Sequence, residues 1–204
     1  LINKKIINAD NLKIVVIDEA DDVLSTGFRK QVKKIFQYVP KESQVALVSA
    51  TIPPEMSNLF DAILKPDFIS ILIKDDQLTL DGIVQFYINL DEQYKFDAII
   101  DLYQYINIGQ GIIYCNRKNK ADELQNVLNS QDFSAGVLHG DMMQKDRENI
   151  MSNFRSGSTR ILITTDMLAR GIDIQQVSLV INFDMPKYLQ TYIHRIGRSG
   201  RYGR

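Results

Sequence analysis

The sequence of 204 residues has one cysteine, no tryptophan, and no apolar run long enough to cross a bilayer. Because Cys115 stands alone, no disulfide can form within the chain, which fits a reducing intracellular compartment, cytoplasmic or nuclear. The first ten residues lack the pattern of a secretory signal. These absences argue against a disulfide-stapled secreted domain, and no membrane is expected among the partners.

An excess of either charge is also missing, since 24 lysines and arginines stand against 25 aspartates and glutamates. The chain as a whole therefore does not attract nucleic acid, and any binding must come from local clusters such as "HRIGRSGRYGR" at 194–204. One cysteine and two histidines leave no zinc-site spacing, and no Gly-x-Ser-x-Gly elbow occurs. The composition is typical of a soluble globular protein with one or two domains.

Short apolar runs alternate with amphipathic stretches along the chain. The runs that predict buried strands cover residues 13–17, 44–48, 111–115, 134–138, 160–164 and 177–182. Helical spacing of apolar residues predicts helices within 28–39, 121–130 and 145–154. Near-continuous apolar strands separated by helices indicate an α/β fold with parallel sheets and helices on both faces.

A polar stretch, "LIKDDQLTLDG" at 72–82, interrupts this alternation. We interpret it as a linker, residues 73–82, between a first unit at 1–72 and a second unit at 83–204. Strand and helix patterns resume after the linker, which predicts that the second unit is also α/β.

The first apolar run leads directly into acids, in "IVVIDEADDVL" at 14–24. In a parallel sheet, ligands collect outside the carboxyl ends of the strands, so Asp18 and Glu19 are expected at such a crevice. Asp18 could hold Mg²⁺, and Glu19 could orient and deprotonate a water that attacks a γ-phosphoryl group. The alternative is an acidic first helical turn that suits the helix dipole, and the short motif alone does not decide between them.

The second run ends in "VSATIPP" at 48–54. Ser49 and Thr51 then lie at a carboxyl edge near Asp18 to Asp21, provided that the two strands are neighbours. Their hydroxyls could relay a hydrogen bond from the acidic cluster to a mobile group. The alternative is that they cap a helix whose first turn contains the prolines.

A third candidate site is "TTDMLARGIDI" at 164–174. Thr164 and Thr165 could donate hydrogen bonds to backbone phosphates, and Gly171 would permit the close approach of a ligand or a tight turn. Asp173 could accept a hydrogen bond from a ribose hydroxyl. A turn-rich loop with a capping aspartate explains the same residues.

The last stretch combines apolar residues at helical spacing with arginines three residues apart. Arg195, Arg198 and Arg201 are expected near a helix end, where guanidinium groups suit phosphate oxygens. A basic solvated tail or a nonspecific nucleic-acid patch is the alternative, but the apolar residues between the arginines need a core and argue against a flexible tail. His194 could act as a coupling donor, although a lone histidine on such a helix is more often held within the core.

Four motifs in this order and spacing resemble those of the DEAD-box RNA helicases. They are "DEAD" (18–21), "SAT" (49–51), "ARGID" (169–173) and "HRIGRSGR" (194–201). Other stretches, including "LTLDGIVQFYINL", "HGDMMQKDR" and "YIHRIGRSGRYGR", are similar to the eukaryotic initiation factor 4A subfamily, a translation factor and its exon-junction relative. The resemblance covers essentially the whole chain and implies two RecA-like domains that close on ATP and RNA.

The resemblance also implies a role for particular residues toward ATP and Mg²⁺. Asp18 would hold the Mg²⁺ ion and Glu19 would position the attacking water. Arg198 and Arg201 would act as arginine fingers on the γ-phosphate, and Asp173 would contact the ribose.

Further implied roles concern coupling and RNA. Asp21 would couple to Ser49 and Thr51, with His194 joining from the other domain. The contacts implied for the sugar–phosphate backbone of RNA are made by Asn116, Arg147 and Thr165. Such contacts are independent of sequence and sensitive to salt. By resemblance, a scaffold protein built of helical repeats is an expected partner.

The chain departs from the family pattern because no Gly-Lys pair, and therefore no phosphate-cradling G-x-x-x-x-G-K-[ST] loop, occurs in it. It begins at Leu1 rather than at a methionine and stops after "GRYGR", so we expect part of a first RecA-like domain and most of a second. We also expect an uncovered apolar face on the first sheet, low stability of residues 1–72, and no ATP hydrolysis by this chain alone.

Three functions therefore remain open from the sequence. The leading one is an ATP-dependent RNA helicase, an ATP hydrolase that acts in translation initiation or mRNA processing. The second is a catalytically silent module that binds RNA or docks a partner. The third is a related translocase acting on DNA, against which the combined motifs argue.

Overall fold

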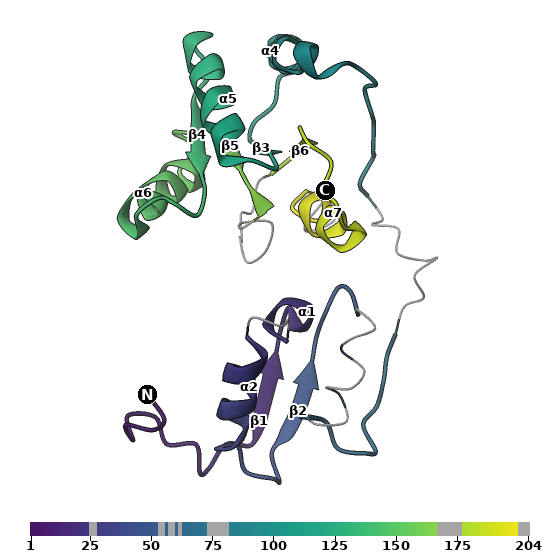
Figure 1. Ribbon diagram of the computed structural model, residues 1–204, viewed down its shortest axis with the longest axis vertical. Helices are drawn as coiled ribbons and strands as arrows, with labels where there is room; N and C mark the ends of the chain where they lie inside the picture. Colours follow the sequence, from purple (N-terminus) through teal and green to yellow (C-terminus); the bar gives the residue numbers. More distant parts are fainter. Residues whose placement is uncertain are drawn as a thin grey trace. The chain divides into compact units, whose positions relative to one another are not determined.

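The computed structural model describes residues 1–24, 28–52, 56, 60, 63–72, 82–166 and 177–199. The chain divides into two compact units, Leu1–Gln77 and Leu78–Arg204, and each is described by itself (Figure 1). The predicted boundaries at 72 and 83 stay predictions, because residues 73–81 lie outside the described part. No helix in the described ranges combines the length and apolarity needed to cross a membrane.

The first unit contains a parallel pair of strands, β1 (Ile14–Ile17) and β2 (Gln44–Leu47), in the register Ile14 to Gln44 and Ile17 to Leu47. Two helices, α1 (Ala20–Val23) and α2 (Arg29–Phe36), lie between these strands in the sequence. Because successive side chains of a strand point to opposite faces, β1 has two different surfaces.

The two faces of β1 differ in their cover. Val15 and Ile17 pack into a cluster with Leu24, Val32 of α2 and Leu47. On the opposite face, the side chains of Ile14 and Val16 are 56% and 61% exposed. The uncovered apolar face that the sequence led us to expect is therefore present.

The second unit is built on a four-stranded sheet in the order β4-β5-β3-β6, and every neighbouring pair is parallel. Its strands are β3 (Gly111–Tyr114), β4 (Ala135–Leu138), β5 (Ile161–Thr164) and β6 (Leu179–Asn182). Its helices are the 3₁₀ turn η3 (Glu92–Tyr94), α4 (Lys95–Tyr105), α5 (Lys118–Ser130), α6 (Gln144–Arg155) and α7 (Leu189–Ile196). The predicted parallel α/β architecture is confirmed.

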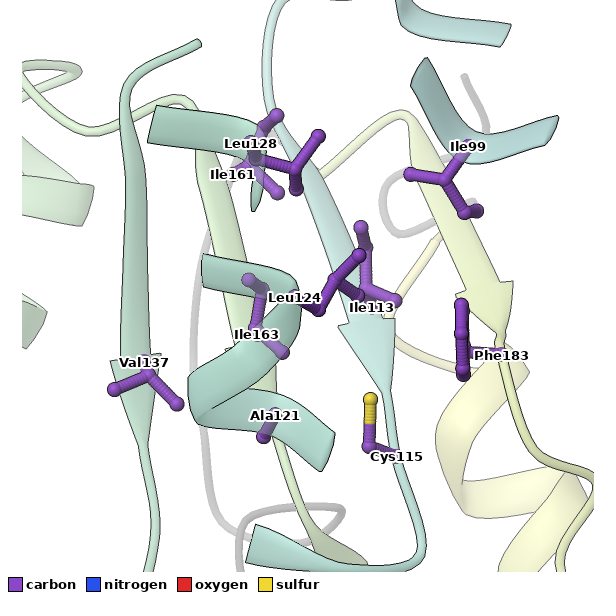
Figure 2. Close-up of a cluster of buried hydrophobic side chains, with 10 residues drawn as sticks. All are labelled: Ile99, Ile113, Cys115, Ala121, Leu124, Leu128, Val137, Ile161, Ile163 and Phe183. Carbon is purple, nitrogen blue, oxygen red and sulfur yellow. The ribbon is translucent and has the colours of Figure 1, made fainter. Parts of the chain in front are cut away.

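Both faces of this sheet are covered. Figure 2 shows the core on one face, where Ile113 of β3 and Ile163 of β5 meet Ile99 of α4 and Leu124 and Leu128 of α5. On the opposite face, the cluster contains Ile112, Tyr114, Leu138, Phe154 and Leu162, with Phe154 contributed by α6. β3 and β5 are consequently buried along their whole length.

The six strands predicted from apolar runs are all present, with ends that differ by one or two residues. The three predicted helices correspond to α2, α5 and α6. One element, α4, was not predicted, although Phe96, Ile99, Ile100 and Tyr103 recur at helical spacing and pack on the core.

Candidate functional site

The acidic motif lies in the turn between β1 and α1, at the carboxyl end of the strand. Asp18 is exposed, Glu19 is half-buried, and Asp21 is 7% exposed in the first turn of α1. The backbone N–H of Glu19 donates to Asp18 Oδ1 at 2.8 Å. Three carboxylates therefore stand within four residues, and burial distinguishes the inward Asp21 from the outward Asp18.

Glu19 adopts a left-handed backbone conformation, with φ of 50° and ψ of 47°. For a residue with a Cβ atom this costs on the order of 1–2 kcal/mol, and such strain concentrates at functional sites. Glu19 occupies the cap position of α1 without a capping hydrogen bond from its side chain. Helix capping thus does not explain this carboxylate, whereas Asp21 and Asp22 do suit the helix dipole.

The second predicted motif meets the first through hydrogen bonds. Thr51 Oγ1 donates to Asp21 Oδ2 at 2.6 Å, and both side chains are buried. Ser49 Oγ accepts the backbone N–H of Asp21 at 3.2 Å and donates to the Thr51 carbonyl at 2.6 Å. The structure therefore brings Asp21, Ser49 and Thr51 together, as a relay requires; residues 53–55, where a capped helix was the alternative, are not described.

The acidic turn fits a magnesium ion in the manner usual for nucleotide sites. Mg²⁺ keeps several waters and is commonly bound by one or two carboxylates together with substrate phosphates. Asp18 offers an exposed carboxylate at the strand end, while no group of three or more His, Cys, Asp or Glu side chains in the described ranges is placed to hold one metal ion. A bound Mg²⁺ would bring charge neutralisation to the phosphate oxygens, with Asp18 as its protein ligand.

In the second unit, the predicted RNA contacts follow neighbouring strands. Asn116 comes just after β3 and is exposed, and Thr165 directly follows β5 and is half-buried. Thr164, by contrast, is fully buried, and its hydroxyl donates to the Leu138 carbonyl at 2.8 Å. The expectation that Thr164 contacts phosphate is therefore wrong, because its side chain is fully buried and its hydroxyl donates to a backbone carbonyl of the neighbouring strand.

Helix α7 and the residues that follow it contribute the histidine and two of the arginines. His194 and Arg195 lie on the helix and Arg198 just beyond it, and all three are at most 7% exposed. Nε of Arg198 donates to the His194 carbonyl at 3.2 Å. A basic solvated tail does not describe these residues, since their burial places them within the packed unit.

The remaining predicted residues fall in two groups. Arg147 lies on α6 and is half-buried. Gly171, Asp173 and Arg201 lie outside the described residues, so the roles predicted for them stay predictions.

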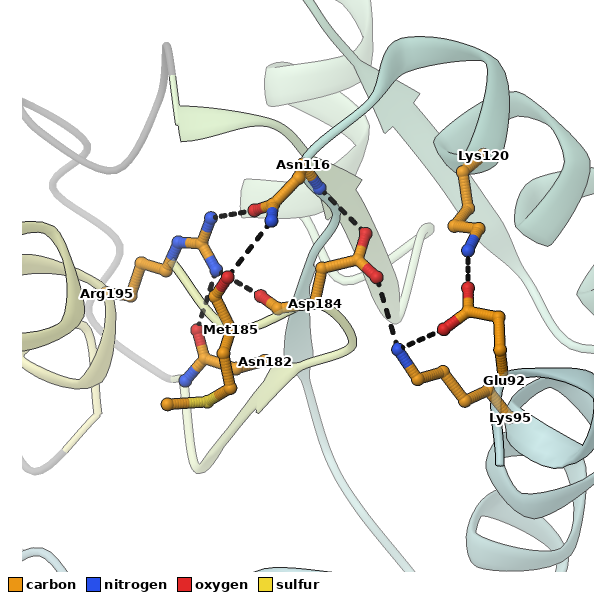
Figure 3. A network of polar contacts seen from close by, with 8 residues as sticks. All are labelled: Glu92, Lys95, Asn116, Lys120, Asn182, Asp184, Met185 and Arg195. Atoms are coloured by element: carbon orange, nitrogen blue, oxygen red, sulfur yellow. Dashed lines mark hydrogen bonds and ion pairs between the residues drawn. The ribbon is translucent and has the colours of Figure 1, made fainter. Parts of the chain in front are cut away.

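The structure also reveals a polar network at the carboxyl edge of the second sheet that the sequence did not predict (Figure 3). The Asp184 carboxylate accepts the Asn116 backbone N–H at 2.9 Å and Lys95 Nζ at 3.3 Å. Glu92 pairs with Lys95 at 2.6 Å and also with Lys120. The only sequence signal was the position of Asp184, two residues past the last predicted strand.

Burial controls the chemistry of two side chains on β3 and beside it. It raises the pKa of the Cys115 thiol to about 12 and that of Tyr114 to about 12. Both therefore stay protonated at physiological pH, and Cys115 is a packing residue rather than a nucleophile.

Comparison with known proteins identifies the class of the chain. Residues 94–203 match the helicase conserved C-terminal domain, and residues 1–59 match the DEAD/DEAH box helicase family. The chain belongs to the DEAD-box helicases. It is 52% identical over 205 aligned residues to eukaryotic initiation factor 4A of Cryptosporidium parvum, covering 100% of this chain and 50% of that protein.

Solved structures agree with this assignment. One of S. cerevisiae Dbp5 bound to RNA and ADP BeF3 has a TM-score of 0.89 and 36% identity, covering 100% of this chain and 54% of that one. A Dbp5 variant bound to Nup159, Gle1, IP6 and ADP has a TM-score of 0.64 and 34% identity, with the same coverage. The chain thus spans about half the length of the proteins it matches.

Proposed function

We propose that this chain forms part of an ATP-dependent RNA helicase of the initiation factor 4A type, which locally unwinds or clamps RNA in translation initiation or mRNA processing. The main support is the buried hydrogen bond between Thr51 and Asp21, 2.6 Å long. It joins two motifs 30 residues apart at the edge where ligands of parallel sheets bind. A cytoplasmic or nuclear location goes with this proposal.

The proposed chemistry is hydrolysis of the γ-phosphate of ATP by an attacking water. Asp18 holds Mg²⁺, and the Glu19 carboxylate accepts a hydrogen bond from the water and orients it. Arg198 and Arg201 supply positive charge to the phosphoryl oxygens, and Gly171 and Asp173 bind the nucleotide. The strained backbone of Glu19 supports this role, because such strain concentrates at functional sites.

Coupling and RNA binding complete the proposal. Asp21, Ser49, Thr51 and His194 transmit the state of the nucleotide to the RNA-binding loops. Asn116, Arg147 and Thr165 are the proposed contacts of the sugar–phosphate backbone, so binding is independent of sequence and weakens with salt.

A second candidate is favoured by one observation, the lack of a Gly-Lys pair in the 204 residues. Without a phosphate-cradling loop nothing holds the α- and β-phosphates, so this chain by itself is expected to bind RNA or a partner without ATP turnover.

Phosphate release, measured with and without single-stranded RNA, tests these proposals. The complete gene product is expected to show RNA-stimulated hydrolysis that Glu19→Gln lowers about 10²–10⁴-fold. The control Glu42→Gln, the same change at an exposed residue, leaves the rate unchanged. Single-stranded DNA is expected not to stimulate, and equal stimulation by DNA would favour the translocase.

The 204-residue chain alone should show no RNA-stimulated release. Turnover by this chain that Glu19→Gln abolishes would contradict that expectation. Absence of turnover from the complete gene product would leave the binding module as the better description.

A scaffold protein of helical repeats is the proposed partner. Its support is that the Dbp5 variant was solved bound to Nup159 and Gle1, so a related chain binds other proteins. Co-purification of the intact gene product with a stoichiometric helical-repeat protein would support it, and recovery as a monomer at all salt concentrations would count against it.

A further inference from the structure

Arg195 is the most deeply buried charge among the described residues, with no exposed surface. Burying a guanidinium is expensive unless all of its hydrogen atoms are bonded and its charge is balanced. A guanidinium buried at such a cost in free energy is expected to have a specific structural role.

All three nitrogens of the Arg195 guanidinium contact partners within the protein. Nε donates to Asp166 Oδ1 at 2.7 Å, and Nη2 lies 2.5 Å from the same oxygen. Nη1 donates to Asn182 Oδ1 at 3.0 Å and to the Asp184 carbonyl at 2.7 Å. Nη2 also donates to Asn116 Oδ1 at 2.9 Å. Four hydrogen bonds and the ion-pair contact with Asp166 engage all three guanidinium nitrogens, so Arg195 is committed to partners within the protein.

These partners come from loops that follow three strands. Asn116 follows β3, Asp166 follows β5, and Asn182 and Asp184 lie at the end of β6. The guanidinium also lies over the Tyr114 ring, 5.1 Å from its centroid. Figure 3 shows Arg195 reaching from α7 to Asn116 and Asn182. One side chain therefore ties α7 to the carboxyl ends of three of the four strands, β5, β3 and β6.

Asn116 is exposed, yet its backbone N–H and both polar atoms of its side-chain amide are hydrogen-bonded. Its amide nitrogen Nδ2 donates to the Met185 carbonyl at 3.0 Å, and its backbone N–H donates to Asp184. Arg195 occupies its amide oxygen. A surface amide with this many bonds has a defined orientation before any ligand arrives.

We propose that Arg195 is a positioning residue that preorganises the two RNA-contacting loops, acting through Asn116 directly and through Asp166 on the adjacent Thr165. The inference rests on the proposed RNA binding of these loops. It assigns Arg195 a role different from that of Arg198 and Arg201, although all three belong to one motif. Fixing the loops in advance lowers the entropy lost when the RNA backbone binds.

Arg195→Lys is the sharpest variant, because it keeps the charge but replaces five donors in a planar fork with three on a point charge. Arg155→Lys is the matched control, since Arg155 is exposed in the last turn of α6. Hydrogen exchange gives a readout that needs no RNA. The Asn116 backbone amide is expected to lose about tenfold in protection in Arg195→Lys while the amides of β3 and β5 keep theirs. Unchanged protection of Asn116, or a loss only in step with the strands, would overturn the proposal.

Binding of fluorescein-labelled single-stranded oligouridine, followed by anisotropy, tests the consequence for RNA. Arg195→Lys is expected to weaken binding about tenfold, and Arg155→Lys not at all. In a double-mutant cycle with Asn116→Ala, the losses are expected to be non-additive, because Arg195 acts through Asn116. Fully additive losses would show an independent role and overturn the proposal.

The proposal can still be tested if Arg195→Lys fails to fold or if the chain binds no RNA. Should Arg195→Lys fail to fold, Asn182→Ala removes one acceptor from Arg195, and the same exchange readout applies with a smaller change expected. Should the wild-type chain bind no oligouridine, the proposed RNA binding fails, while the exchange experiment still decides whether Arg195 positions Asn116.

Discussion

The two sheets of this chain are made from the same kind of strand and differ in what covers them. Ile14 and Val16 of β1 are more than half exposed, whereas Ile112 and Ile113 of β3 are fully buried. Apolar runs of equal length therefore do not imply equal burial. The second sheet is stabilised by cores on both faces, and the first depends on one core and on polar contacts at its edge.

The largest expected effect comes from truncating one isoleucine in each sheet. Ile113→Ala should destabilise the second unit by about 3–5 kcal/mol, because it leaves a cavity between β3 and α5. Ile14→Ala removes the same atoms from an exposed position and should cost at most about 1 kcal/mol. Hydrogen exchange of the strand amides reports each unit separately.

The same exchange data test the comparison in the wild type. Amides of β3 and β5 are expected to be better protected than those of β1 and β2. Equal protection of the two sheets, or similar costs for the two alanine variants, would mean that the open face of β1 is covered in solution.

A smaller effect is expected at the polar edge of the first unit. Thr51→Val keeps the shape of the side chain but removes the donor to the buried Asp21, at a cost of about 1–3 kcal/mol. Thr51→Ser retains the hydroxyl and is the control. The readout is exchange of the β1 and β2 amides, and indifference to the valine would show that the relay does not stabilise the first unit.

A change of about 1 kcal/mol is expected at the opposite end of the second sheet. The Tyr103 hydroxyl is buried with no hydrogen-bond partner in the described residues, and burial raises its pKa. Tyr103→Phe should therefore be neutral or stabilising by up to about 1 kcal/mol. Thermal unfolding of the variant and the wild type measures it, and a clear loss of stability would reveal a partner for the hydroxyl.

Gly111 offers a matched test of the same contact. A Cβ atom there would lie 2.7 Å from the Tyr103 hydroxyl oxygen, so Gly111→Ala should destabilise the unit. Tyr103→Phe removes that oxygen and should recover most of the loss in the double variant. Additive effects would show that the strain arises elsewhere.

The smallest effect is expected for the solvent-exposed ion pair of Lys118 and Asp141. Hydrogen bonding to Asp141 raises the pKa of Lys118, and the bond to Lys118 lowers the pKa of Asp141. Any contribution of the lowered Asp141 pKa is therefore present above its unfolded pKa and lost as pH falls. Solvent screens the pair, so Lys118→Gln should leave the melting temperature unchanged at neutral pH.

Lys95→Gln provides the contrast, because Lys95 is partly buried and bonded to Asp184. It should lower the melting temperature measurably. If Lys118→Gln had the larger effect, surface charge rather than the network would support the second unit.

The strands and the coupling of the first two motifs were predictable from the sequence for a physical reason. Runs of β-branched residues identify strands, and neighbouring parallel strands bring their carboxyl ends together, which places Asp21 beside Thr51. Helix α4 was also predictable, because apolar side chains recur in it at helical spacing and pack on the core, namely Phe96, Ile99, Ile100 and Tyr103.

The role of Arg195 could not be predicted in the same way. Arg195 and Arg198 look alike in the sequence, and only the fold shows that Arg195 donates hydrogen bonds to Asp166, Asn182, Asp184 and Asn116. Thr164 and Thr165 are likewise neighbours of the same type, yet Thr164 ends β5 fully buried and Thr165 follows the strand half-buried. The three-dimensional structure is needed to distinguish the roles of the two residues in each pair.

The left-handed turn at Glu19 has a consequence for protein engineering. Glycine enters that backbone region at little cost, so Glu19→Gly should raise the melting temperature of the first unit slightly while removing the carboxylate proposed to orient water. Selection for thermal tolerance alone would then favour loss of the acid. A chain that retains glutamate at this turn has a slightly less stable first unit but keeps the carboxylate.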